Sequence, residues 1–315
     1  MLITLNNKTL RLRSPMVTAH GTTTDRHIIE ITAEEDGFFG YGEAAPLPSF
    51  GAETFEETHI ALTEWSKNPD SLPDPPVARS GAAAALDYLQ QSKLRTPLPP
   101  GAVAVQALIG ALEISSVERQ ISDAIDDGYR AVKLKVAATA TTSDVERIEL
   151  AIRLIDSRVL LRLDANGGWT EQQALAVLTR VDASRIALVE EPTSVPSDWG
   201  KIKRETGIAV GADEHLTDRQ QIDRLIELEA AQTFVLKPSI LGGPPATRSI
   251  AALAATNDIE IVISSFLDGP IALRTARDLA LELAPEQIHG LGTAPLFEDE
   301  FPQDVQPVDG HLHRR

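Results

Sequence analysis

The stretch VKLKV, residues 132–136, decides how the fold of this chain is interpreted, because apolar and charged residues alternate in it. Successive side chains of a β-strand point to opposite faces, so the three apolar residues share one face and Lys133 and Lys135 share the other. A buried strand does not tolerate two lysines without partners. Acidic residues from elsewhere in the chain should therefore face them.

From about residue 103 onward, short apolar runs alternate with segments that have the pattern of helices. This alternation predicts a parallel sheet whose strands are linked by helices. Seven or eight such units favour a barrel of the triosephosphate isomerase type over a doubly wound sheet, whose usual GxGxxG motif is absent. The apolar runs are AVQALIG, YRAVKLKV, RVLLRLDAN, RIALVEEP, IAVGADEH, TFVLKPS and IEIVISS.

The first hundred residues have a different pattern. The stretches MLITLNNKTLRLRS and RHIIEITAEEDGFFGYGEAAP predict an antiparallel strand meander, and two helical segments follow. The alanines at 82–85 predict a tight helix-packing surface, and the proline-rich residues 94–103 predict a domain boundary. The chain should therefore hold an α+β unit over residues 1–100 and the barrel over residues 101–289.

Each apolar run of the expected barrel ends in polar residues that a buried strand would not normally carry. Counted from Lys135, successive members of this series are separated by 23 to 29 residues, which is one strand–helix unit. They should lie at one level, at the carboxyl ends of their strands, where the active sites of such barrels are built. In chain order the residues are Lys133 and Lys135, Asp164, Glu190 with Glu191, Asp213 with Glu214, Lys237, and Ser264 with Ser265.

Three carboxylates on successive strands predict a metal site. Asp164, Glu190 and Asp213 offer hard oxygen ligands, which suit Mg²⁺ or Mn²⁺ rather than zinc. One such acid alone would more often cap a helix or form a salt bridge, but three in register would repel one another unless a cation or lysines neutralised them. Glu190 is favoured over Glu191, which precedes a proline and should face away, whereas Asp213 and Glu214 are harder to separate.

The lysines at both ends of this arc predict acid–base chemistry. A lysine close to a metal or to a second lysine has a lowered pKa and can act as a base near neutral pH. Lys135 and Lys237 on opposite sides of a metal suit the removal of a proton next to a carboxylate. The alternatives are a cationic strand edge, a phosphate site or a non-catalytic anion-binding barrel.

Composition and charge argue against several classes of protein. A net charge of −17 disfavours non-specific nucleic-acid binding, which needs basic patches. The absence of cysteine excludes disulfides, thiolate zinc sites and a cysteine nucleophile. No apolar stretch approaches the length of a membrane span, about 18 residues, and the first residues lack a signal-peptide core. We therefore expect a cytoplasmic protein that acts on a small molecule.

The motifs VKLKV, LRLDAN, VEEP, GADEHL and VLKPSILGG, in this order, resemble the enolase superfamily and, within it, the muconate-cycloisomerase-like subgroup. The resemblance covers nearly the whole chain. It implies a modified (β/α)7β barrel with an α+β capping domain that the C-terminal tail, about residues 290–315, completes. It also implies that the three acids hold Mg²⁺, that Lys135 is the acid–base residue and that Lys237 faces it across a carboxylate substrate.

Further roles implied by the resemblance concern the surroundings of the metal and the substrate. The capping segment 19–24 would close over the substrate. Lys133 would support Lys135 electrostatically. The residues implied in substrate binding or near the metal are Lys133, Asn166, Gly242, Ser264 and Ser265.

Two further stretches, GYGEAAPLPSFGAETFEE and HGLGTAPLFEDEF, are most similar to subgroup members of menaquinone biosynthesis. The implied reaction is the syn dehydration of 2-succinyl-6-hydroxy-2,4-cyclohexadiene-1-carboxylate. The alternatives are an N-acylamino acid racemase or a dipeptide epimerase, which would use Lys135 and Lys237 as two bases, and muconate cycloisomerase is a further variant. Dipeptide epimerases usually hold the substrate ammonium with acidic residues, and Asp268 is the lone candidate here.

Overall fold

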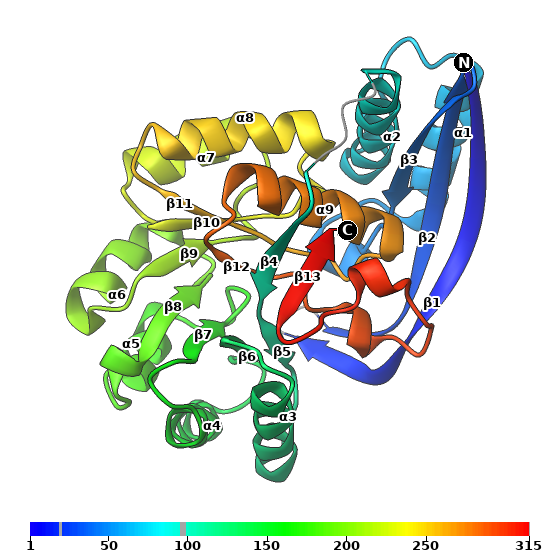
Figure 1. Cartoon of the computed structure of the whole chain (residues 1–315). Helices are drawn as coiled ribbons and strands as arrows, with labels where there is room; N and C mark the ends of the chain where they lie inside the picture. The colour runs from blue at the N-terminus through cyan, green and yellow to red at the C-terminus, as the bar shows by residue number, and fades with distance from the viewer. Residues whose placement is uncertain (19–20, 95–98, 315) are drawn as a thin grey trace.

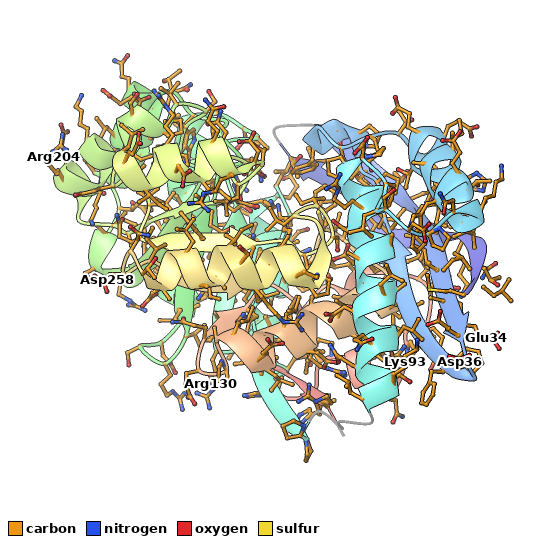
Figure 2. All side chains as sticks on the ribbon, turned by 90° about the horizontal axis from the view of Figure 1, so that it is seen from above. Glu34, Asp36, Lys93, Arg130, Arg204 and Asp258 are labelled. Atoms are coloured by element: carbon orange, nitrogen blue, oxygen red, sulfur yellow. The ribbon has the colours of Figure 1, made fainter. Side chains whose placement is uncertain are left out.

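The computed structural model describes residues 1–18, 21–94 and 99–314 (Figure 1). An antiparallel sheet with two helices lies beside a barrel of parallel strands surrounded by helices (Figure 1). Seen from above, charged side chains such as Arg204 and Asp258 lie around the periphery, away from the centre of the barrel (Figure 2). In the described part of the chain, no helix is long and apolar enough to cross a membrane.

The capping domain consists of three strands and two helices. Its sheet has the order β1 (Leu2–Thr18), β2 (Gly21–Glu35), β3 (Phe38–Ala44), with neighbours antiparallel. The turn between β2 and β3 has positive φ at Asp36 and Gly37, the conformation that a two-residue hairpin requires. Helices α1 (Phe55–Lys67) and α2 (Pro76–Leu94) follow. The strand meander expected from the sequence is confirmed.

The barrel strands alternate with helices as the sequence predicted. The parallel sheet has the order β11-β10-β9-β8-β7-β6-β5, so neighbours in space are also neighbours in the chain. Its strands are β5 (Ala107–Ile109), β6 (Ala131–Lys135), β7 (Leu160–Asp164), β8 (Ile186–Glu190), β9 (Val210–Ala212), β10 (Thr233–Leu236) and β11 (Glu260–Ile263). The helices are α3 (Ile114–Asp126), α4 (Thr141–Leu154), α5 (Glu171–Leu178), α6 (Trp199–Thr206), α7 (Arg219–Glu227), α8 (Gly243–Ala255) and α9 (Pro270–Leu283).

Two short strands and one isolated bridge close the sheet into a barrel. β4 (Gly101–Val105) runs directly into β5 and pairs in parallel with β12 (Ile288–His289). Next to β12, Gly290 forms a parallel bridge with Ser264 at the end of β11. The expected (β/α)7β barrel is therefore confirmed, and the doubly wound alternative is wrong.

The buried ring of His289 fastens this closure. The backbone N–H of Ile263 donates to Nδ1 of His289 at 3.0 Å, and Nε2 lies 2.9 Å from the carbonyl oxygen of Ala284. Because Nδ1 accepts this hydrogen bond, the neutral ring carries its proton on Nε2 and donates it to the carbonyl oxygen of Ala284. Burial lowers the pKa of His289 to about 4.

The C-terminal segment contacts both parts of the molecule. Its first half runs along the capping sheet, where the N–H of Glu298 donates to the carbonyl oxygen of Arg11. Its last strand, β13 (His311–Arg314), pairs antiparallel with β4 (Figure 1). Residues 95–98, in the middle of the proline-rich stretch expected to be a boundary, lie outside the described residues.

Small residues let α2 lie directly against β3. The alanines at 82–85 are all buried, which confirms the packing surface expected from the sequence. A Cβ atom at Gly42 would lie 2.1 Å from the carbonyl oxygen of Gly81 on α2. No relaxed contact is that short, so a side chain at this position would force the helix away from the sheet.

We expect Gly42→Ala to lower the free energy of unfolding by at least about 1–3 kcal/mol, because the added methyl group meets the helix backbone. Gly110→Ala is the control, since a Cβ atom there would meet nothing within 4 Å among the described residues. It should stay within about 1 kcal/mol of the wild type. Denaturant titration of the three proteins measures both values, and equal stability of the two variants would contradict the packing argument.

The lowered pKa of His289 predicts a loss of stability in mild acid. A histidine whose folded pKa, about 4, lies below its unfolded value of 6.5 stabilises the protein at high pH, and this contribution is lost as the pH falls. When the pH falls from 7 to 5, we expect this residue to lower the free energy of unfolding by about 2 kcal/mol. Denaturant titration at both pH values should show a smaller loss for His289→Asn, whose side-chain oxygen accepts the same bond without titrating. An equal loss in both proteins would contradict this.

Candidate active site

Three carboxylates meet at the carboxyl ends of the barrel strands. Asp164 ends β7, Glu190 ends β8 and Asp213 follows β9. Strand pairing sets Lys135 beside Asp164 and Asp164 beside Glu190, so these residues share the level that their spacing predicted. Each acid of the triad offers one oxygen within 4.8 Å of the others, and all three are buried.

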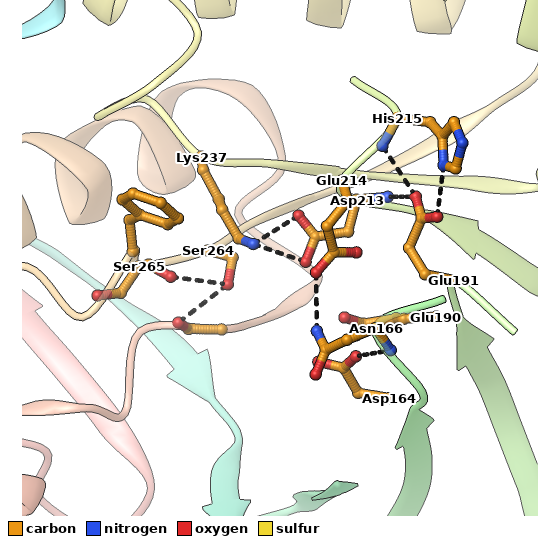
Figure 3. Close-up of polar contacts among 12 residues, drawn as sticks. Asp164, Asn166, Glu190, Glu191, Asp213, Glu214, His215, Lys237, Ser264 and Ser265 are labelled. Atoms are coloured by element: carbon orange, nitrogen blue, oxygen red, sulfur yellow. Dashed lines mark hydrogen bonds and ion pairs between the residues drawn. The ribbon is translucent and has the colours of Figure 1, made fainter. Parts of the chain in front are cut away.

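The two lysines of β6 face these carboxylates. Nζ of Lys133 lies 3.0 Å from Oδ2 of Asp164 and 2.9 Å from Oε2 of Glu190. Nζ of Lys135 lies 2.7 Å from the same Asp164 oxygen. Across the site, Nζ of Lys237 lies 2.7 Å from the carboxylate of Asp213 (Figure 3). The acidic partners that VKLKV required are therefore Asp164 and Glu190 of the triad.

Pairing determines the charge states in this cluster. Burial alone would lower the pKa of Lys133, but Asp164, Glu190 and Asp213 outweigh it and raise the pKa. Burial likewise opposes the ionisation of Asp164. The charges of Lys133 and Lys135 favour it more strongly, so the pKa of Asp164 is lowered. Adjacent carboxylates stabilise the ammonium groups of Lys133 and Lys237 and raise the pKa of both lysines.

The triad is suited to a divalent cation. Oε1 of Glu190 is buried and accepts no hydrogen bond from any described residue. Burial raises the pKa of Glu190 although Lys133 acts against it. A buried carboxylate with an unused oxygen, beside two further carboxylates, offers the hard ligands that cations such as Mg²⁺ prefer. Asp164, Glu190 and Asp213 would hold the ion.

Asn166 links Asp164 and Lys135 to Glu214. Its backbone N–H donates to Oδ1 of Asp164 at 3.1 Å, and its side-chain oxygen accepts from Nζ of Lys135 at 2.9 Å. Its Nδ2 donates to Glu214 at 2.7 Å (Figure 3). Burial and then the charge of Asp213 raise the pKa of Glu214 to about 8. The closely spaced carboxylates are those of Asp164, Glu190 and Asp213, so Asp213 rather than Glu214 belongs to the triad.

Glu191 holds the backbone that follows β9 through hydrogen bonds. Its buried side chain accepts hydrogen bonds from the N–H of Asp213 at 2.7 Å and the N–H of His215 at 3.1 Å. Nδ1 of His215 lies 2.6 Å from its other oxygen (Figure 3). Glu191 faces away from the pocket, as expected. Its link to His215 was not foreseen, because residues on neighbouring strands show no sequence signal for such a contact.

A pocket opens above these residues, with about 590 Å³ of empty space when the adjoining open solvent is included. The capping domain contributes Met16, Thr18, Leu47 and Phe50 to its wall, and sequence reasoning missed them because positions so spaced along the chain give no periodic signal. Ala19 and His20, from the segment expected to close over the substrate, lie outside the described residues. On the barrel side, the polar lining residues include Lys133, Lys135, Asp164, Asp213, Lys237, Ser264, Ser265 and Thr293.

Of the five residues expected to bind substrate or to lie near the metal, Lys133, Ser264 and Ser265 line the pocket, whereas Asn166 and Gly242 are not among the described residues that do. The hydroxyl of Thr293, which also lines it, donates to Oγ of Ser265 at 3.1 Å. Gly242 immediately precedes α8, and its N–H donates to Oγ of Ser80 at the contact between α8 and α2. The role of Gly242 in substrate binding stays a prediction.

Comparison with known proteins agrees with this geometry. The family model described as "Enolase C-terminal domain-like" matches residues 116–315. The o-succinylbenzoate synthase of Salmonella arizonae is 31% identical over 279 residues, which cover 86% of this chain and 83% of that protein.

Two solved structures share the fold. The muconate lactonizing enzyme of Pseudomonas fluorescens has a TM-score of 0.85 at 21% identity, covering 99% of this chain and 92% of that one. The N-succinyl Arg/Lys racemase of Bacillus cereus has a TM-score of 0.83 at 24% identity, covering 95% and 89%. Together with the family match and the similarity to the synthase, these structures show that the chain belongs to the enolase superfamily of enzymes.

Proposed function

We propose that this enzyme is an o-succinylbenzoate synthase, a cytoplasmic lyase of menaquinone biosynthesis that uses Mg²⁺. It would dehydrate 2-succinyl-6-hydroxy-2,4-cyclohexadiene-1-carboxylate to 2-succinylbenzoate. The observation that carries the proposal is the convergence of Lys135 and Lys237 with acids of the triad on one pocket. Similarity to the Salmonella arizonae synthase over most of the chain supports the choice of substrate.

Lys135 is the proposed base and acid of the reaction. In its neutral form it would take the proton α to the ring carboxylate, and the electron pair left on carbon would expel the hydroxyl group. Lys135, now protonated, would then give this proton to the departing hydroxide. Water would leave from the same face of the ring, and the ring would become aromatic. A bound Mg²⁺ would stabilise the negative charge that develops on the substrate carboxylate.

Lys237 is the proposed cation on the other side of the substrate. Its Nζ bonds Asp213 and lies 5.8 Å from the ring centre of Phe50 and 5.5 Å from that of Phe266. Aromatic faces and a carboxylate both favour the charged form of a lysine. This arrangement supports a role in charge stabilisation.

A racemase or epimerase of the same superfamily is the second candidate, because both lysines line the pocket and could serve as two bases. The surroundings of Asp268 count against a dipeptide substrate. Its buried carboxylate accepts the N–H of Phe266 at 2.9 Å, inside its own loop. Asp268 is not among the described residues that line the pocket, so the one acid expected to hold a substrate ammonium is turned away.

We expect the purified enzyme with Mg²⁺ to consume the succinyl-hydroxycyclohexadiene carboxylate, followed as loss of the diene absorbance. Lys135→Ala should lower kcat by about 10²–10⁴-fold or more, because it removes the acid–base group. Lys201→Ala, which removes an exposed lysine paired with Glu171, should keep wild-type activity. Wild-type enzyme that leaves the diene intact but exchanges the α-proton of N-acylamino acids into deuterated water would instead support the racemase.

Metal binding can be measured without catalysis. Mg²⁺ should raise the melting temperature of the wild type, since a ligand that binds only the folded state stabilises it by about 2.7 kcal/mol at 100 times its Kd. Asp213→Asn should abolish this shift by removing a ligand. Asp223→Asn, at an exposed acid paired with Arg219, should retain it. A Mg²⁺-induced shift of wild-type size in Asp213→Asn, measured by scanning calorimetry, would rule out the triad as the site.

A further inference from the structure

Arg26 of β2 is buried at the contact between the capping domain and the barrel. It is 1% exposed, and its guanidinium donates to four backbone carbonyl oxygens. On the capping side these belong to Ala45 at 2.5 Å and Pro46 at 2.6 Å. On the barrel side they belong to Leu267 at 3.1 Å and Phe266 at 3.2 Å. One side chain thus joins two segments that are more than two hundred residues apart in the chain.

Both segments form the wall of the active-site pocket. Leu47 and Phe50 follow directly after Ala45 and Pro46, and Phe266 and Leu267 line the pocket themselves. The rings of Phe50 and Phe266 meet edge to face, with centroids 5.9 Å apart. The apolar wall is therefore shared by the two domains, and its halves meet at these rings.

The barrel half of this wall has a backbone that needs support. Leu267 has a φ of 55°, in the left-handed region that is unfavourable for a leucine. Its carbonyl oxygen is the one that Nε of Arg26 binds. Glu43, from β3, accepts the N–H of Gly269 at 2.6 Å and that of Ile271 at 3.1 Å, so the capping domain holds this loop at two points.

We propose that Arg26 is a positioning residue that holds the Phe50 and Phe266 halves of the pocket wall together and thereby sets the affinity for the substrate. Only a planar guanidinium can present separate donors to carbonyls on two sides. A lysine offers one nitrogen, which cannot span both segments. The wall touches apolar parts of a substrate before and during the reaction alike, so loosening it weakens binding without removing a reacting group.

Arg26→Lys and Arg277→Lys form a matched pair for the test. Arg277 is 4% exposed and also binds backbone carbonyls, those of Asp304 at 2.8 Å and His313 at 3.2 Å. It fastens the C-terminal segment and is not among the described residues that line the active-site pocket. Loss of either guanidinium should lower the melting temperature, so stability alone does not separate the two roles.

Hydrogen exchange and kinetics separate them. In Arg26→Lys we expect amides of residues 47–50 and 266–269 to exchange at least about tenfold faster, and Arg277→Lys should leave them at wild-type rates. With the diene substrate, KM should rise about tenfold or more in Arg26→Lys while kcat changes less than about threefold. The kinetic part rests on the proposed function, whereas the exchange part does not.

The outcomes are distinguishable. Wild-type enzyme without activity on the diene would refute the proposed function, and exchange would still decide the role of Arg26. Wild-type exchange in both segments, or an equal rise of KM in Arg277→Lys, would overturn the proposal. If Arg26→Lys does not fold, Arg26→Gln replaces it. Failure of both to fold, with Arg277→Lys folded, would make Arg26 a residue of general stability and would also overturn the proposal.

Discussion

The ion pairing of Lys133 with Asp164 and Glu190 is the interaction on which the site depends. Two carboxylates this close, both buried, would repel each other in the absence of a cation. The ammonium of Lys133 bonds both of them, and Lys135 and Lys237 pair with Asp164 and Asp213. The strand register brings the ends of β6, β7 and β8 to one level at the mouth of the barrel. At that level the lysine ammonium groups compensate the negative charge of the carboxylates.

The pocket needs both domains, but for different reasons. The barrel supplies the charged groups, because parallel strands end at one face and deliver Lys135, Asp164 and Lys237 to the same place. The capping domain supplies wall residues from the end of β1 and from the segment that follows β3. Buried Arg26 and Glu43 fasten this side of the pocket to the barrel through backbone hydrogen bonds across the domain contact.

The same charged groups serve more than one reaction within a superfamily of this kind. A lysine on each side of a metal site can act as one base and one cation, as we propose, or as two bases. In the proposed enzyme, selection between substrates would depend on the wall, where Asp268 is turned into its loop and aromatic rings flank Lys237. Fold and reacting groups therefore constrain the chemistry, and the wall constrains the substrate.

The sequence alone determined the barrel, the metal-binding triad and the inward direction of both lysines of VKLKV. These follow from local periodicity and from the regular spacing of strand ends, which do not depend on contacts between distant segments. Only the tertiary structure decided that β12 and His289 close the barrel, that Glu191 braces Asp213 through its N–H, and that Arg26 joins the two halves of the pocket wall. Each of these contacts joins groups that folding brings together. Backbone carbonyl and amide groups occur throughout the chain, so the sequence does not show which of them will accept or donate such a bond.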